Sequence, residues 1–320
     1  MSNVKVCLIG GTGRSGTTIL KKIFSSHPLT TTTPEGRLTI DPDGIVDFYT
    51  SIKNNWSPYI YHRKLERLIR VLREMSKRCG MRERLVAKVF PSQRPRYGNL
   101  AYSELCTNFD LLVNELEASL TEFRYDGSWV GMEKGESREL RFSEPSLDIL
   151  RESIEIFLRG VYSGICKQDS EASEFYVEDN TWNFIHFDSI LEMLPDAKLV
   201  HIHRDFRDVV ASYVKQTWMP SCPLKSARIL RSLLNRWEEV KGRLPQESYH
   251  EASLYDIVRE PRSKIREVSD FWGVPWDESL MTTRLDRANE GRWKTQFSDV
   301  ESEGVYQILE QHLRRYGYDT

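Results

Sequence analysis

The chain has 320 residues, of which 39% are hydrophobic and 29% are charged, and its formal net charge is −2. This composition excludes collagen-like, coiled-coil and wholly disordered proteins, and the balanced charge argues against a nucleic-acid binder, which carries a basic excess. The five cysteines lie far apart, and no apolar run reaches the roughly 18 residues of a membrane span. We therefore expect a cytoplasmic protein without a disulfide framework, a metal site or a membrane span.

The first 26 residues predict a strand, a glycine-rich turn and a helix. Residues 4–9 form a compact apolar run, which is typical of a buried parallel strand, and two glycines follow it. Apolar residues then recur at helical spacing over residues 15–26. A doubly wound α/β sheet begins in this way.

The middle of the chain is less regular. Helical patterns cover residues 63–78 and 111–123, a short strand is expected over 85–90, and another helix begins at Ser143. We interpret the region of about 40–170 as a largely helical insertion within a single domain of residues 1–320.

Strands and helices alternate again after the insertion. Strands are predicted over residues 175–178, 198–203 and 248–255, and helices over 185–194, 208–215 and 300–316. The whole pattern predicts an α/β fold in which helices flank a central parallel sheet.

The turn between the first strand and the first helix is a candidate phosphate site. It consists of Gly11, Thr12, Gly13, Arg14, Ser15, Gly16, Thr17 and Thr18. Backbone N–H groups at the start of a helix, together with the helix dipole, bind anions. The planar guanidinium of Arg14 also suits a tetrahedral oxyanion.

The glycine loop fits two known templates. Its three glycines satisfy the G-x-G-x-x-G pattern of dinucleotide-binding proteins, and Glu35 follows Gly16 by 19 residues. It also has the glycine spacing of a nucleotide-triphosphate P-loop, with Thr18 at the Ser/Thr position. Thr17 replaces the P-loop lysine, and this argues against ATP or GTP hydrolysis.

A second segment combines an arginine and a hydroxyl. Arg204 ends the strand predicted over 198–203, and Ser212 lies eight residues further on, just over two helical turns. The two groups can therefore face the same side and form a second phosphate site. Alternatively, Arg204-Asp205 and Arg207-Asp208 could be solvated ion pairs of little energetic consequence.

Together the two segments resemble the sulfotransferase superfamily that uses 3′-phosphoadenosine 5′-phosphosulfate (PAPS). Residues 12–18 are similar to its 5′-phosphosulfate loop. Its 3′-phosphate motif, R-D-x-R-D-x-x-x-S, is matched by Arg204, Asp205, Arg207, Asp208 and Ser212. The resemblance covers residues 1–40 and 175–320, and it implies a three-layer, P-loop-like fold.

The resemblance also implies an activity. The sulfuryl group of PAPS would pass to a hydroxyl, or less readily an amine, by in-line displacement, leaving 3′-phosphoadenosine 5′-phosphate and needing no metal. Arg14 and the rest of the glycine loop would hold the 5′-phosphosulfate. Arg204 and Ser212 would hold the 3′-phosphate, and Arg292 and Lys294 would close over it.

The general base and the acceptor are less constrained. Relatives place a catalytic glutamate where this chain has Glu35, although a solvated Glu35 paired with Arg37 is an equal alternative. His201 and His203 are rival bases, but their strand positions favour a structural role. The acceptor could be a small molecule, a carbohydrate, a lipid or a peptide, and its selectivity is expected to reside in the 40–170 insertion.

Two other functions fit parts of the sequence. One is an atypical NAD(P)-binding short-chain reductase that uses the glycine loop and Glu35. Its Tyr-x-x-x-Lys pair could only be Tyr49 and Lys53, which come too early in the chain. The other is a non-catalytic nucleotide-binding module.

Overall fold

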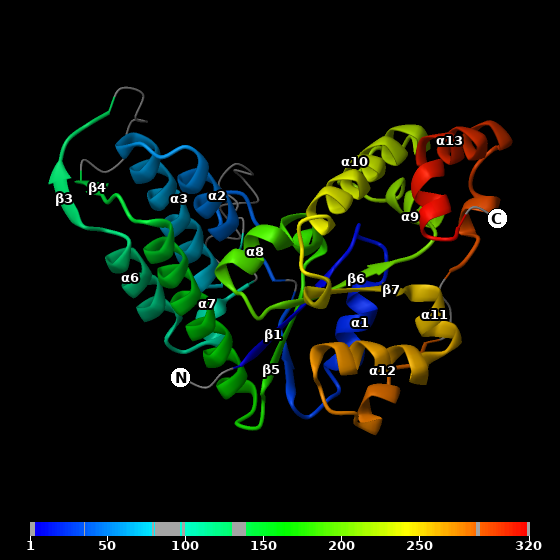
Figure 1. Cartoon of the computed structure of the whole chain (residues 1–320), viewed down its shortest axis with the longest axis horizontal. Helices are drawn as coiled ribbons and strands as arrows, with labels where there is room; N and C mark the ends of the chain where they lie inside the picture. Colours follow the sequence, from blue (N-terminus) through cyan, green and yellow to red (C-terminus); the bar gives the residue numbers. More distant parts are fainter. Residues whose placement is uncertain are drawn as a thin grey trace. The chain divides into compact units, whose positions relative to one another are not determined.

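The structure is a computed structural model, and it describes residues 4–34, 36–78, 80, 97, 100–129, 139–285 and 289–318. The chain divides into two compact units, which are drawn in Figure 1. Unit 1 comprises Met1–Val4, Gly36–Glu174 and Ser189–Pro195. Unit 2 comprises Lys5–Glu35, Phe175–Asp188 and Asp196–Thr320.

Unit 2 contains five parallel strands in the order β2-β5-β1-β6-β7. The strands are β1 (Lys5–Gly10), β2 (Thr30–Thr32), β5 (Phe175–Asp179), β6 (Lys198–His203) and β7 (Tyr249–Ser253). Central β1 pairs with both β5 and β6, so that Ile9 lies between Asp179 and Val200. Because neighbouring parallel strands end at one edge of a sheet, the segments that follow β1 and β6 emerge side by side.

Helices cover both faces of this sheet (Figure 1). One face packs against α1 (Thr17–Phe24), α11 (Leu254–Arg259) and α12 (Pro261–Trp272). The other side carries α9 (Phe206–Tyr213), α10 (Pro223–Lys241) and α13 (Asp299–Arg315), which share an apolar core of their own. Short 3-10 turns are η2 (Thr181–His186), η3 (Gln246–Ser248), η4 (Glu278–Met281) and η5 (Arg292–Thr295). The predicted three-layer α/β fold with a central parallel sheet is confirmed.

Unit 1 is mostly helical, as the sequence predicts. Its helices are α2 (Ile45–Asn54), α3 (Pro58–Ser76), α5 (Tyr102–Leu105), α6 (Phe109–Ser119) and α7 (Leu147–Asp169), and α8 (Phe187–Met193) runs into it from unit 2. The hydroxyls of Ser57 and Ser146 accept hydrogen bonds from the first turns of α3 and α7, and so define where these helices begin. The strand expected over 85–90 lies outside the described residues.

An antiparallel hairpin in unit 1 was not predicted. It pairs β3 (Phe123–Asp126) with β4 (Glu139–Phe142). Buried Glu117 on α6 accepts hydrogen bonds from Arg124 of β3 and Arg141 of β4. Although burial by itself raises the pKa of Glu117, these arginines hold that pKa below its usual value. The ionised carboxylate therefore ties the hairpin to the helices.

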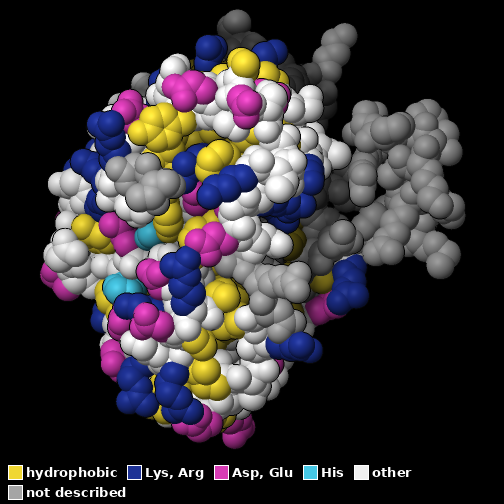
Figure 2. All heavy atoms as spheres, turned by 90° about the vertical axis from the view of Figure 1, so that its right-hand side faces the viewer, with side chains coloured by type: hydrophobic (Ala, Val, Ile, Leu, Met, Phe, Trp, Pro, Cys, Tyr) yellow, Lys and Arg dark blue, Asp and Glu magenta, His cyan; other side chains and the backbone are white. Residues whose placement is uncertain are grey.

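The surface is charged but mixed in sign. On the face shown in Figure 2, basic and acidic side chains alternate over the described surface, in keeping with the net charge of −2. Across the described ranges, none of the helices combines the length and the apolar character needed to cross a membrane.

Candidate active site

The glycine loop after β1 is held by contacts from more distant parts of unit 2. The N–H of Gly11 donates to the Thr181 carbonyl over 3.1 Å, and the Tyr213 hydroxyl donates to the Thr12 carbonyl. A side chain at Gly11 has no space, because its Cβ would lie 2.5 Å from Ser15 Oγ and 2.6 Å from the Ile202 carbonyl. The loop therefore has one available path, which turns directly into α1.

Three loop residues adopt a left-handed backbone. They are Gly13 (φ 76°), Arg14 (φ 57°) and Gly16 (φ 115°). Glycine adopts this conformation at little cost, whereas for arginine it is strained and occurs mostly at functional sites. The strained turn presents the exposed Arg14 side chain, whose Nε donates to Ser212 Oγ over 3.0 Å.

The inner surface of the loop fits an anion. Among the described residues, none accepts a hydrogen bond from the backbone N–H groups of residues 13–18. The hydroxyl of Ser15 is buried and likewise has no partner in the described part of the chain. Unpaired donors at the start of a helix are the usual surroundings of a bound phosphate. The residues present thus fit the phosphate end of a nucleotide.

A second cationic group follows β6. Arg204 is only 6% exposed, and its Nη2 donates to the Asp208 carbonyl over 3.0 Å. Burial lowers the pKa of Arg204, and the positive charges of Arg14 and Arg292 lower it further, against the influence of Tyr255 and Asp208. The charges of Arg14 and Arg292 thus disfavour the charged form of Arg204, an effect that an anionic ligand would offset.

Asp208 connects α9 to the loop that carries Arg292. Its carboxylate accepts hydrogen bonds from the backbone N–H groups of Gly291 (2.8 Å) and Trp293 (3.0 Å), and from the Tyr255 hydroxyl. Asp208 itself is fully buried. This residue therefore fixes the backbone on both sides of Arg292 and brings that arginine to Arg204.

The interpretation of the second motif as solvated ion pairs is wrong for Arg207. Arg207 forms a two-pronged ion pair with Asp205, whose carboxylate also caps α9, and the side chains are 8% and 10% exposed. The motif thus contains two sets of residues. Ser212 contacts Arg14, whose charge acts on buried Arg204, whereas Asp205, Arg207 and Asp208 build the surrounding framework.

The remaining predicted residues differ in exposure and in their contacts. Lys294 is exposed and lines a polar cavity of about 390 Å³ beside Trp293 and Tyr318. Thr17 is buried at the start of α1, and Thr18 is exposed. Glu35 lies outside the described residues, and Arg37, its suggested partner, forms an ion pair with Asp41 at 3.1 Å.

The two histidines of β6 are packed as structural residues. His201 Nδ1 lies 3.2 Å from Glu251 Oε1, and His203 Nδ1 lies 2.9 Å from the Tyr318 hydroxyl. Both rings are buried beside aromatic side chains, including Trp237 of α10. These contacts agree with the structural role predicted for them.

The buried ring of His203 predicts a pH dependence of stability. Burial lowers its pKa from 6.5 to about 3, so below pH 6.5 the unfolded chain binds a proton that the folded chain does not. Stability should therefore fall as the pH drops from 6.5 towards 3, and His203 should account for about 3 kcal/mol at pH 4. Glu251 stays ionised over this range, because its hydrogen bonds hold its pKa below the usual value despite burial.

Chemical unfolding at pH 4 and pH 7 measures this effect. The variant His203→Gln can still form a hydrogen bond with the Tyr318 hydroxyl but cannot titrate, and so it should lose less stability between the two pH values. An equal loss in the variant and the wild type would show that His203 is not the responsible group.

Several residues outside the predicted site border or support the loop. A Cβ at Gly13 would lie 3.2 Å from Thr181 Cγ2 and 3.6 Å from Trp218 Cη2, so both residues border the loop. Tyr213 and Tyr255 support the glycine loop and Asp208, respectively. Their sequence positions carry no signal, since each contact joins segments far apart in the chain.

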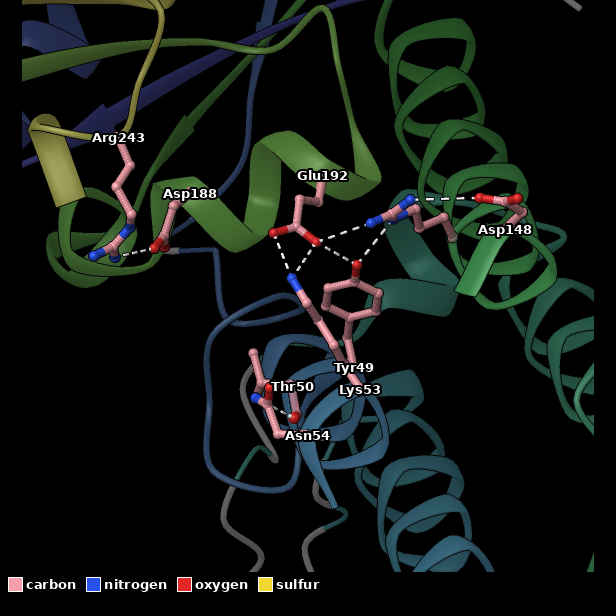
Figure 3. Close-up of polar contacts among 9 residues, drawn as sticks. Tyr49, Thr50, Lys53, Asn54, Asp148, Asp188, Glu192 and Arg243 are labelled. Atoms are coloured by element: carbon pink, nitrogen blue, oxygen red, sulfur yellow. Dashed lines mark hydrogen bonds and ion pairs between the residues drawn. The ribbon is translucent and has the colours of Figure 1, made fainter. Parts of the chain in front are cut away.

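Nothing supports the reductase alternative. The Tyr49 hydroxyl donates to Glu192, and Lys53 forms an ion pair with the same carboxylate at 2.7 Å (Figure 3). Arg151 completes the group by donating to the Tyr49 hydroxyl. This Tyr-x-x-x-Lys pair thus holds a carboxylate within unit 1, whereas the glycine loop belongs to unit 2.

The fold and the two arginine-bearing loops define a P-loop-like α/β protein. The model of the Sulfotransferase family matches residues 113–278, which is just over half of the chain. The chain belongs to this family and is a sulfotransferase. It therefore moves a sulfuryl group from a donor to an acceptor.

The fold has a counterpart among solved structures. The sulfotransferase domain of the olefin synthase from Synechococcus PCC 7002 superposes with a TM-score of 0.50 at 16% identity, covering 100% of this chain and 97% of that one. The sulfotransferase domain from the curacin biosynthetic pathway gives 0.49 at 13% identity, with 97% of both chains covered. A sulfotransferase from Mycobacterium tuberculosis gives 0.46 at 13% identity, covering 96% and 76%. No curated protein sequence matches the chain.

Proposed function

We propose that the chain transfers the sulfuryl group of PAPS to a hydroxyl of its acceptor. The observation that carries this proposal is the hydrogen bond from Arg14 to Ser212, which joins the two motifs beside buried Arg204, whose pKa is lowered by the charges of Arg14 and Arg292. A nucleotide with a single phosphate chain would occupy the glycine loop alone. The additional buried cation at the end of β6, Arg204, would pair with a second phosphate. PAPS carries such a phosphate at its 3′ position, and ATP does not.

Each part of the site has a distinct role in this proposal. The N–H groups of residues 13–18, with the hydroxyls of Thr17 and Thr18, hold the oxygens of the 5′-phosphosulfate. Arg14 offsets the charge that grows on the 5′-phosphate. Arg204 and Ser212 hold the 3′-phosphate, and Arg292 with Lys294 closes over it.

PAPS supplies the sulfuryl group, which moves by in-line displacement. The S–O bond to the acceptor forms while the S–O bond to the 5′-phosphate breaks. The protein's contribution is positioning and charge stabilisation, as in phosphoryl transfer. The acceptor proton passes to a base, for which Glu35 is our candidate. The pair of electrons from the broken bond stays on the 5′-phosphate, next to Arg14.

We further propose that both units belong to one sulfotransferase domain, with the 40–170 insertion selecting the acceptor. In unit 1 the insertion presents exposed aromatic side chains, including Phe123 and Tyr125 of β3. Small-molecule, carbohydrate, lipid and peptide hydroxyls are all retained as acceptor classes. Among the described residues, no group of His, Cys, Asp or Glu side chains is arranged to hold a metal ion.

Calorimetry with 3′-phosphoadenosine 5′-phosphate tests the donor directly. We expect saturable binding of one nucleotide per chain and no binding of NADPH. Incubation with radiolabelled PAPS and cell extracts should then yield labelled acceptors. Absence of nucleotide binding would overturn the proposed donor, whereas binding without transfer to any acceptor would leave a nucleotide-binding module.

A further inference from the structure

Tyr318 is inserted into unit 2 by the turn that ends α13. Gly317 adopts a left-handed backbone (φ 72°), and the N–H of Tyr318 donates back to the Leu313 carbonyl over 2.8 Å. The Tyr318 ring makes edge contacts with the rings of His203, Phe206 and Tyr255, at centroid distances of 5.8–5.9 Å. Its hydroxyl lies 2.9 Å from His203 Nδ1. The chain end is thus anchored by both ring and hydroxyl.

The backbone of Tyr318 also holds Arg207. Arg207 Nη2 donates to the Tyr318 carbonyl over 2.6 Å, while the same guanidinium is paired with Asp205. The guanidinium then lies under the Trp293 ring, with its Cζ 4.3 Å from the ring centroid. A cation fixed on one side by a carbonyl and a carboxylate offers a rigid surface for the aromatic ring.

Trp293 belongs to the loop that carries Arg292. Asp208 accepts hydrogen bonds from the N–H groups of residues 291 and 293, and Arg207 contacts the Trp293 ring, so the backbone on both sides of Arg292 is held in place. The charge of Arg292 reaches Arg204, which marks the 3′-phosphate side of the site. Tyr318 is therefore linked to that side through Arg207 and Trp293.

We propose that Tyr318 is a positioning residue for the donor: through Arg207 and Trp293 it holds the loop of residues 291–294 so that Arg292 meets the 3′-phosphate. This inference rests on the proposed use of PAPS. It assigns a function in donor affinity to the segment that follows α13. Tyr318 itself touches no phosphate and acts only through the loop.

A double-mutant cycle on the affinity for 3′-phosphoadenosine 5′-phosphate tests the proposal. Tyr318→Ala should weaken binding about tenfold, the typical worth of one charge-assisted hydrogen bond. Arg292→Ala should weaken it by a similar factor. If Tyr318 acts through Arg292, the double variant should bind the nucleotide less than twofold more weakly than Arg292→Ala alone.

Controls separate positioning from general stability. Tyr306 is a half-buried tyrosine of α13 that packs on the core of α9, α10 and α13, so Tyr306→Ala makes the same chemical change away from Arg207. It should lower the melting temperature but leave nucleotide affinity within twofold. Trp293→Ala, which removes the ring from the half-buried loop and not from the core, should reproduce the affinity loss of Tyr318→Ala.

The possible results are distinct. If the losses of affinity caused by Tyr318→Ala and Arg292→Ala multiplied in the double variant, the positioning role would be overturned. Unchanged affinity in both Tyr318→Ala and Trp293→Ala would also overturn it. If instead the wild-type chain bound no 3′-phosphoadenosine 5′-phosphate, the proposed donor itself would be wrong.

Discussion

Arg14→Ala is expected to lower the rate of sulfuryl transfer by about two to three orders of magnitude, because it removes a positive charge aimed at the leaving 5′-phosphate. The fold should be unaffected. Arg14 is exposed, and alanine carries the same backbone strain at φ 57° as arginine does, so the free energy of unfolding should change by no more than about 0.5 kcal/mol. Initial rates with labelled PAPS and thermal melts measure the two effects.

Lys22→Ala is the matched control for this variant. Lys22 is an exposed cation on α1, and its removal changes the net charge of the chain by the same amount. It should retain nearly all of the activity. If Arg14→Ala kept more than a tenth of the wild-type rate, the glycine-loop arginine would not be the group that stabilises the leaving phosphate.

Arg204→Met should separate donor binding from stability. Loss of charge-assisted hydrogen bonds to a phosphate costs about 2–3 kcal/mol, which corresponds to roughly 30- to 150-fold weaker binding of 3′-phosphoadenosine 5′-phosphate. The folded state lowers the pKa of Arg204, which means that it disfavours the charged form relative to the unfolded chain. Replacing this buried cation with an apolar side chain of similar length should therefore not lower the stability of the free protein.

Thermal shift measurements with and without the nucleotide check both halves of this expectation. The nucleotide should raise the melting temperature of the wild type and have little effect on Arg204→Met. Arg228→Met, at an exposed position on α10, makes the same substitution away from the site and should respond like the wild type. Equal stabilisation of wild type and Arg204→Met would remove Arg204 from the donor site.

The strands of the sheet were the most predictable part of the fold. The range of β6 agrees with the prediction, and β1 is shifted by one residue, because buried parallel strands are continuous apolar runs. In contrast, α10 was missed although Leu230, Leu234 and Trp237 follow a helical period. The β3–β4 hairpin was missed although Phe123 and Tyr125 alternate with Arg124 and Asp126, because each of its strands spans only four residues.

The candidate site was predicted in part. Two motifs that end adjacent strands had to meet, and the contact between Arg14 and Ser212 joins them. The framework was not predictable, since Asp208 contacts Gly291 across 83 residues of sequence and Arg207 contacts Tyr318 across 111. Local patterns contain no information about such pairings. Sequence spacing alone therefore suggested solvated ion pairs where the fold makes a buried ion pair and long-range hydrogen bonds.

The position of β5 and β6 on either side of β1 has a consequence for how the protein is made. The ribosome delivers β1 and the glycine loop first, but Thr181 and Tyr213, which hold that loop, follow about 170–200 residues later. At a translation rate of about 5–20 residues per second, these partners are synthesised roughly 10–40 s after the loop. A nascent chain halted before α9 would thus carry the whole glycine motif and still lack the contact from Tyr213.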